Sequence, residues 1–170
     1  MSNAIQTLEH IGQINIRAVS TKTIQALEDY LGMSLPQTPN TSTSSSTQTL
    51  LWLSPDEWLL LTDYASSHQT TLDLKTCIAE HSGAITNVSD NRVRFLLSGL
   101  ESHKILQHGT AIDVPKLNPG DVVQTLFAKT QMIIHCLEPC HYQLFVRTSF
   151  KDYTETFLTD CIQTQGKWVS

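Results

Sequence analysis

The chain has 170 residues, of which 40% are hydrophobic, and it carries a formal net charge of −5 with an isoelectric point near 5.7. A chain of this length can bury a core without disulfides or metal ions. A protein with this negative net charge has no overall positive field to attract a phosphate backbone, which argues against nucleic acid as a partner.

Membrane and secretory classes are also disfavoured. No apolar run approaches the roughly 20 residues that a helix needs to cross a bilayer. The start MSNAIQTLEHIGQ has neither the basic region nor the long apolar segment of a secretory signal. We therefore expect no membrane partner and a cytoplasmic location, where cysteines remain free thiols.

The first elements are a strand and a helix. IGQINIRAV, over residues 11–19, alternates apolar and polar side chains, which is typical of a half-buried strand. Ser20 is placed to cap a helix that follows, and Gly32 suits the position just past its end. Residues 36–49, PQTPNTSTSSSTQT, contain no hydrophobic residue, so we expect an exposed Ser/Thr-rich loop.

The stretch LLWLSPDEWLLLTD, over residues 50–63, places two carboxylates between apolar runs. Asp56 and Glu57 are adjacent, and adjacent side chains on a strand point to opposite faces, so they cannot both reach one substrate atom. We interpret the pair as the solvated bend of a hairpin. Trp52 and Trp58 are interpreted as core or interface anchors.

Further along, helices and strands alternate. Leu74, Cys77, Ile78 and His81 recur at helical spacing, which predicts a short helix that stops before Gly83.

VRFLLSG, over residues 93–99, predicts a strand. Ser98 and Glu101 have the spacing of a capping box for a helix that runs to about His108. The runs VVQTLFA, QMIIHCL and YQLFV predict an antiparallel meander. Ser149 is placed to cap a last helix with an apolar stripe.

This order of elements repeats once. Both halves read as strand, helix, paired strands and helix, with a period near 80 residues. We predict an α+β fold in a single domain over residues 1–170. It consists of two intertwined β-α-β-β-α subdomains with mainly antiparallel sheets, over about residues 11–82 and 83–165.

The segment HCLEPCH is a candidate metal site. His135, Cys136, Cys140 and His141 are zinc-type ligands, and three residues separate the cysteines, within the usual spacing. Against this, His135 and Cys136 are neighbours on a predicted strand and would face opposite ways. We favour thiols and histidines beside a hairpin turn, and metal analysis of the purified protein distinguishes the two interpretations.

A catalytic or cofactor site is not evident. The chain has no nucleophile elbow, phosphate-binding loop or dinucleotide-binding glycine pattern. Cys77 and Cys161 fall on apolar helical stripes, where a thiol behaves as a small hydrophobic group. Asp113, in GTAIDVPKL, is the one candidate carboxylate, and a turn-capping role is the simpler interpretation.

Several blocks resemble the gamma subunit of heterotetrameric sarcosine oxidase. They include INIRA, LGMSLPQTPN, LLWLSPDEWLLLT, VSDNRVRFLLSG, GTAIDV, NPGDVVQTLFAKTQMIIH and YQLFVRTSFKDYTETFL, in order over about residues 11–165. More distantly they are similar to the folate-binding domain of glycine-cleavage T-protein, which implies the folate-binding fold of T-protein and TrmE-like proteins.

The resemblance implies a subunit of an oxidoreductase complex in sarcosine catabolism and one-carbon metabolism. Such a complex demethylates sarcosine oxidatively to glycine, with hydrogen peroxide and, in the presence of tetrahydrofolate, methylenetetrahydrofolate as products. The alpha and beta subunits carry FAD, FMN, NAD and the folate site, and the delta subunit carries zinc. We expect this chain to contact the alpha subunit directly, to bind no cofactor and to be structural.

The resemblance to T-protein also implies a rival function. Asp113 matches a catalytic aspartate of that wider family, so a stand-alone folate-dependent one-carbon transfer protein is the alternative. Two departures weigh against it. Asn87 stands where the family has an aspartate, and KTQMIIHC replaces an acidic, glycine-containing segment.

Overall fold

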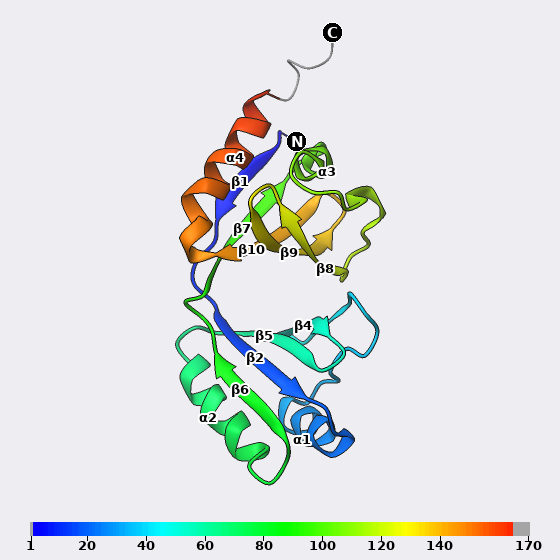
Figure 1. Cartoon of the computed structure of the whole chain (residues 1–170), viewed down its shortest axis with the longest axis vertical. Helices are drawn as coiled ribbons and strands as arrows, with labels where there is room; N and C mark the ends of the chain where they lie inside the picture. The colour runs from blue at the N-terminus through cyan, green and yellow to red at the C-terminus, as the bar shows by residue number, and fades with distance from the viewer. Residues whose placement is uncertain (1, 165–170) are drawn as a thin grey trace. The chain divides into compact units, whose positions relative to one another are not determined.

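The computed structural model describes residues 2–164 and contains, within them, two five-stranded antiparallel sheets with helices (Figure 1). The predicted α+β class with antiparallel sheets is therefore confirmed. Met1 and residues 165–170, which include the end of the second predicted half, lie outside the described part.

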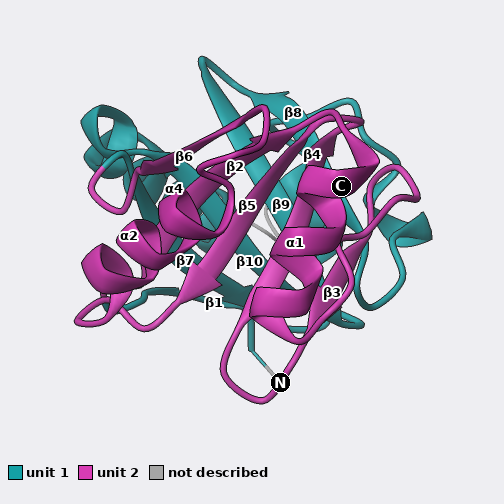
Figure 2. Cartoon of the chain, turned by 90° about the horizontal axis from the view of Figure 1, so that it is seen from below, with its two compact units in different colours: residues 1–9, 91–170 teal, residues 10–90 magenta. Residues whose placement is uncertain are grey.

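The chain folds into two compact units (Figure 2). We call residues 10–90 the inner unit, and residues 1–9 with 91–170 the terminal unit. The sequence prediction places the break between the halves at residues 82 and 83, whereas the strand at residues 83–87 lies in the inner unit.

The inner unit contains a sheet of order β3-β4-β5-β2-β6 and two helices. Its elements are β2 (Gly12–Ala18), α1 (Thr21–Leu31), β3 (Ser42–Ser44), β4 (Thr49–Ser54), β5 (Glu57–Thr62), α2 (Ser67–Cys77) and β6 (Gly83–Asn87).

Helix α1 begins and ends as predicted. The Ser20 side chain accepts a hydrogen bond from the Thr23 backbone N–H at 3.1 Å. Gly32 adopts a left-handed conformation with φ of 64° and donates its N–H to the carbonyl of Glu28. The apolar side of α1 packs with α2 and one face of the sheet into a core that includes Ile14, Leu27, Trp58, Leu60 and Leu74.

The terminal unit has a sheet of order β1-β7-β10-β9-β8. Its elements are β1 (Ala4–Thr7), β7 (Arg92–Ser98), α3 (Ser102–Gln107), the 3-10 turn η1 (Val114–Lys116), β8 (Val122–Phe127), β9 (Thr130–Glu138), β10 (His141–Arg147), the 3-10 turn η2 (Thr148–Phe150) and α4 (Lys151–Thr164). Strands β8, β9 and β10 form the predicted meander.

One face of this sheet packs against α3 and α4. Its core includes Phe95, Leu97, Ile105, Phe127, Ile134, Leu144 and Leu158. The rings of Phe127 and Phe157 meet edge to face, with centroids 5.2 Å apart. Alternation along the strands therefore leaves Arg92, Arg94 and Arg147 on the opposite face of the sheet.

The two sheets have equivalent topologies. The order β8-β9-β10-β7-β1 matches β3-β4-β5-β2-β6, with α3 equivalent to α1 and α4 to α2. The edge strands β1 and β6 are exchanged between the two halves of the sequence. β1 immediately precedes β2 but pairs with β7 of the second predicted half, and β6, which begins the second predicted half, pairs with β2 of the first. These two pairings intertwine the halves.

Two predictions for the inner unit differ from the structure. The Ser/Thr-rich segment 36–49 is mostly exposed but contains β3, which pairs with β4 around a turn held by the Ser45 hydroxyl and the Gln48 N–H. Backbone pairing needs no apolar side chains, so composition could not reveal this strand. Helix α2 ends at Cys77, earlier than predicted, and His81 is exposed beyond it.

Two predicted helix caps in the terminal unit are wrong. Ser98 is the last residue of β7 rather than a cap, because Gly99 turns the chain at φ of 123° and α3 begins only at Ser102. Ser149 lies inside the 3-10 turn η2, and α4 begins at Lys151. Sequence spacing alone does not reveal that a turn lies between Ser98 or Ser149 and the helix that follows.

No helix within residues 2–164 combines the length and the apolar character needed to span a bilayer.

Candidate functional site

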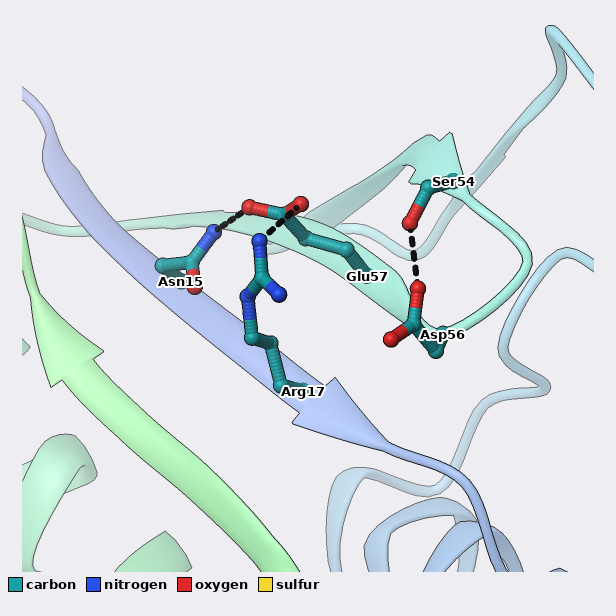
Figure 3. A network of polar contacts seen from close by, with 5 residues as sticks. All are labelled: Asn15, Arg17, Ser54, Asp56 and Glu57. Carbon is teal, nitrogen blue, oxygen red and sulfur yellow. Dashed lines mark hydrogen bonds and ion pairs between the residues drawn. The ribbon is translucent and has the colours of Figure 1, made fainter.

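The acidic pair Asp56 and Glu57 lies at the predicted bend, but its two carboxylates differ (Figure 3). Ser54, at the end of β4, donates its hydroxyl to Asp56 at 2.6 Å. That hydrogen bond lowers the pKa of the Asp56 carboxyl. Asp56 is therefore held in the turn itself, as expected of a polar bend.

Glu57 instead faces strand β2, its neighbour in the sheet. Its carboxylate accepts hydrogen bonds from the Asn15 amide and from the Arg17 guanidinium, both at 2.7 Å. Arg17 and Glu57 are directly opposed in the β2–β5 register, so the ion pair follows from strand pairing. The expectation of a merely solvated carboxylate is wrong for Glu57, which links two strands.

The tryptophans flank this bend as anchors. Trp58 is fully buried in the core of the inner unit, and its indole N–H donates to the Pro36 carbonyl at 2.8 Å. Trp52 is its cross-strand partner and is partly buried against the same core. The predicted core role is confirmed for Trp58.

Asp113 lies just before the 3-10 turn η1. Its carboxylate forms an ion pair with Lys116 at 2.6 Å, and both side chains are more than half exposed. Its backbone carbonyl also accepts a hydrogen bond from the Lys116 N–H at 3.0 Å. Asp113 therefore lies in a surface turn, where its side chain pairs with Lys116 and makes no capping hydrogen bond to the η1 backbone. Catalysis by Asp113 stays a prediction.

The four candidate metal ligands do not form one group in the described part of the chain. Cys136 is buried in the core of the terminal unit, so its neighbour His135 lies on the other face of β9. Beyond the strand, the Cys140 thiol lies 3.7 Å from the Leu100 carbonyl. The His141 ring nitrogen Nδ1 lies 3.2 Å from the Pro139 carbonyl.

Across residues 2–164, no group of three or more His, Cys, Asp or Glu side chains is arranged to hold a metal ion. The structure therefore does not bring His135, Cys136, Cys140 and His141 together.

Burial favours the neutral forms of His135, Cys136 and Tyr142 at this hairpin. Burial lowers the pKa of His135, opposed by a hydrogen bond with Gln143, and burial raises the pKa of Cys136. Burial also raises the pKa of Tyr142 to about 12. A thiol whose pKa is raised is less available as a thiolate, the form that ligates metals and attacks electrophiles.

One cluster was not anticipated from the sequence. Arg92, Arg94 and Arg147 share one face of the terminal unit's sheet, from the paired strands β7 and β10. The available signal is the spacing of Arg92, just before the predicted strand 93–99, and Arg94 within it, because residues two apart on a strand share a face. Arg147 joins them only through strand pairing, which the sequence does not reveal.

Comparisons with known proteins give a family and a fold. The model of the sarcosine oxidase gamma subunit family matches residues 16–164. A search of curated proteins finds no match.

Among solved structures, one of heterotetrameric sarcosine oxidase from Corynebacterium sp. U-96 in complex with pyrrole 2-carboxylate is similar at a TM-score of 0.87 and 21% identity. The match covers 95% of this chain and 84% of that one.

A second similar structure is glycine cleavage system aminomethyltransferase T from Bartonella henselae, with a TM-score of 0.70 and 11% identity. That match covers 92% of this chain but 45% of the other. At these identities the two structures establish the fold, while the family model establishes membership. The chain belongs to the sarcosine oxidase gamma subunit family.

Proposed function

We propose that this chain is the gamma subunit of a heterotetrameric sarcosine oxidase and acts as a structural component of the complex. The observation that carries the proposal is the family match over residues 16–164. The match to a chain of a heterotetrameric sarcosine oxidase, over 95% of this sequence, supports it at the level of the fold.

The proposal includes partners and a division of labour. The chain contacts the alpha subunit directly, in the cytoplasm, and joins the beta and delta subunits through the complex. The other subunits hold FAD, FMN, NAD, tetrahydrofolate and zinc, and they convert sarcosine to glycine with hydrogen peroxide and methylenetetrahydrofolate as products.

A structural role agrees with the geometry of the candidate residues. Asp113 is paired with Lys116 on the surface, and the thiol of Cys136 is buried in the core. The Glu57 carboxylate is occupied by Asn15 and Arg17. Each of these groups has a structural partner, as expected if the reacting groups lie on other chains.

Co-expression with the other three subunits tests the assembly. A tag on this chain should recover the alpha, beta and delta subunits in a stoichiometric complex with sarcosine-dependent peroxide formation. Omission of this chain should reduce the yield of the assembled complex, and the isolated chain should form no peroxide. Elution of this chain alone, or robust activity of the isolated chain, would refute the proposal.

The rival folate-dependent function has a separate test. Calorimetric titration of the isolated chain with tetrahydrofolate should give no micromolar binding if the role is structural. The Asp113→Ala variant serves as the matched control, because Asp113 is exposed and its replacement leaves the core intact. Micromolar binding that disappears in this variant would instead establish the folate-dependent function.

A further inference from the structure

Three of the chain's four arginines lie on one face of a single sheet. Arg92 and Arg94 alternate on β7, and Arg147 ends β10. Their neighbours Val93, Phe95 and Val146 pack toward the helices, so the arginines project from the other face. The whole protein has a net charge of −5, so this face is positively charged on a protein that is negative overall.

Two of the like charges on this face are directly opposed. Arg147 lies directly opposite Arg92 in the β7–β10 register, and like charges in opposed positions destabilise a sheet. Arg147 forms no side-chain hydrogen bond or ion pair with any residue in the described range 2–164.

Arg94 is compensated only in part. Its Nη2 donates to the Glu9 backbone carbonyl at 2.8 Å, while its buried Nε has no acceptor among the described residues. Burial lowers the pKa of this guanidinium. Arg94 therefore adds a positive charge to the face without bringing a carboxylate that could neutralise Arg147.

A pocket of about 270 Å³ opens on the same face, lined by residues of the terminal unit alone. Arg92 and Arg147 contribute guanidinium groups, and Gln124 and Gln131 contribute amides from β8 and β9. Ile133 and Phe145, which are almost fully buried, also line it. The pocket therefore combines several hydrogen-bond donors with an apolar surface.

We propose that this pocket, the arginine pocket, binds a small organic anion through its carboxylate or phosphate group. A guanidinium presents parallel N–H donors that match the oxygens of either group, and an anion beside Arg147 would relieve its repulsion from Arg92. Ile133 and Phe145 offer contact to an apolar body attached to the anion. The volume lies near the lower limit of small-molecule pockets, about 300 Å³, which suits a small ligand better than a protein segment.

Nuclear magnetic resonance of the ¹⁵N-labelled full chain tests this proposal independently of any partner subunit. Benzoate and inorganic phosphate are the two anionic probes, and benzylamine is a cationic probe with the same ring as benzoate. Each titration is made at constant ionic strength, because added salt screens exposed charges. The side-chain Nε–H signals of the four arginines provide a direct readout, and the Arg147 signal is assigned by its loss in Arg147→Gln.

We expect benzoate or phosphate to shift the Arg147 signal saturably, and benzylamine to leave it in place. Benzoate alone would identify a carboxylate ligand, and phosphate alone a phosphate ligand. Arg147→Gln should weaken binding at least about tenfold, as expected when a charge-assisted hydrogen bond is lost. Because Arg147 is exposed, this variant should fold normally.

The matched control is Lys75→Gln, which removes the same charge from an exposed position on α2 in the inner unit. It should bind the anion with unchanged affinity. The proposal is overturned if neither anion shifts the Arg147 signal saturably. It is equally overturned if Arg147→Gln and Lys75→Gln weaken binding to the same extent, since that result would indicate attraction by net charge alone.

Discussion

The indole N–H of Trp58 donates a hydrogen bond to the backbone carbonyl of Pro36, 2.8 Å away. The contact connects the second strand of the hairpin with the start of the Ser/Thr-rich segment, 22 residues earlier. It gives one side chain two separable roles, filling the core of the inner unit and satisfying a carbonyl.

Replacement of Trp58 separates these two roles. Trp58→Ala removes a fully buried indole and should lower the free energy of unfolding by about 3–5 kcal/mol. Trp58→Phe keeps an aromatic ring but leaves the carbonyl without this donor, so a smaller loss of about 1–3 kcal/mol is expected.

Urea denaturation followed by circular dichroism measures both changes. Trp52→Ala, at the partly buried partner position, is the control and should lose less than Trp58→Ala. Equal losses in Trp58→Phe and Trp58→Ala would assign the effect to the hydrogen bond rather than to packing.

The two carboxylates of the bend should respond differently to neutralisation. Asp56→Asn keeps an oxygen that can accept from Ser54, so the urea midpoint at pH 7 should not change measurably. Glu57→Gln keeps one oxygen acceptor, places an amide N–H₂ toward the other of the two donors, Asn15 or Arg17, and should cost about 1 kcal/mol. Activity of the assembled complex should be unchanged in Asp56→Asn, and an assembled but inactive complex would show that this carboxylate takes part in the chemistry.

Gly109 should be intolerant of a side chain for steric reasons. A Cβ at this position would lie 2.5 Å from the Phe127 ring, which is fully buried and packed against Phe157. Gly109→Ala should therefore cost about 1–3 kcal/mol, as overpacked cores do.

Gly32→Ala is the contrasting variant, measured by the same denaturation. Its Cβ would have no atom within 4 Å, so only its left-handed φ of 64° opposes the change, at about 1 kcal/mol. Gly32→Asn should be milder still, because asparagine tolerates this conformation. A Gly109→Ala chain as stable as the native one would mean that Phe127 can move aside.

Buried His135 should make the chain sensitive to acid. Burial lowers its pKa in the folded state, so the unfolded chain takes up a proton at a higher pH than the folded chain. The stability that the neutral ring contributes is present above the unfolded pKa of about 6.5 and is lost as pH falls from there through the folded value. The urea midpoint should therefore decline between pH 7 and pH 5.

His135→Gln should flatten this decline, because glutamine does not titrate. The same replacement at the exposed His68 on α2 is the control for the loss of a histidine outside the core. The same slope in the native chain and in His135→Gln would place the acid sensitivity elsewhere.

Local interactions account for the elements that were predicted correctly. Ser20 and Gly32 cap α1 through contacts within a few residues, and such contacts are encoded by short motifs. The strands β7 and β10 follow from runs of strand-forming apolar residues. The capping box at Ser98 and Glu101 failed because its spacing is also compatible with a strand end, a glycine turn and a later helix start.

Strand pairing accounts for what the prediction missed. β1 is an exposed four-residue strand, and β6 is a mostly exposed five-residue strand, so neither has a strong pattern. Each is ordered by a sheet whose other strands are distant in sequence, β1 by β7 and β6 by β2. The partners of the candidate residues depend on register in the same way, as Arg17 with Glu57 and Arg92 with Arg147 demonstrate.

The sequence by itself determined the α+β class, the helix α1 with both of its ends, and the blocks that identify the family, because these depend on periodicity and local motifs. Only the tertiary structure decided the exchange of β1 and β6 and the addition of Arg147 to the face that carries Arg92 and Arg94. The physical reason is that backbone hydrogen bonds between distant strands fix which side chains become neighbours, and those bonds do not depend on side-chain identity.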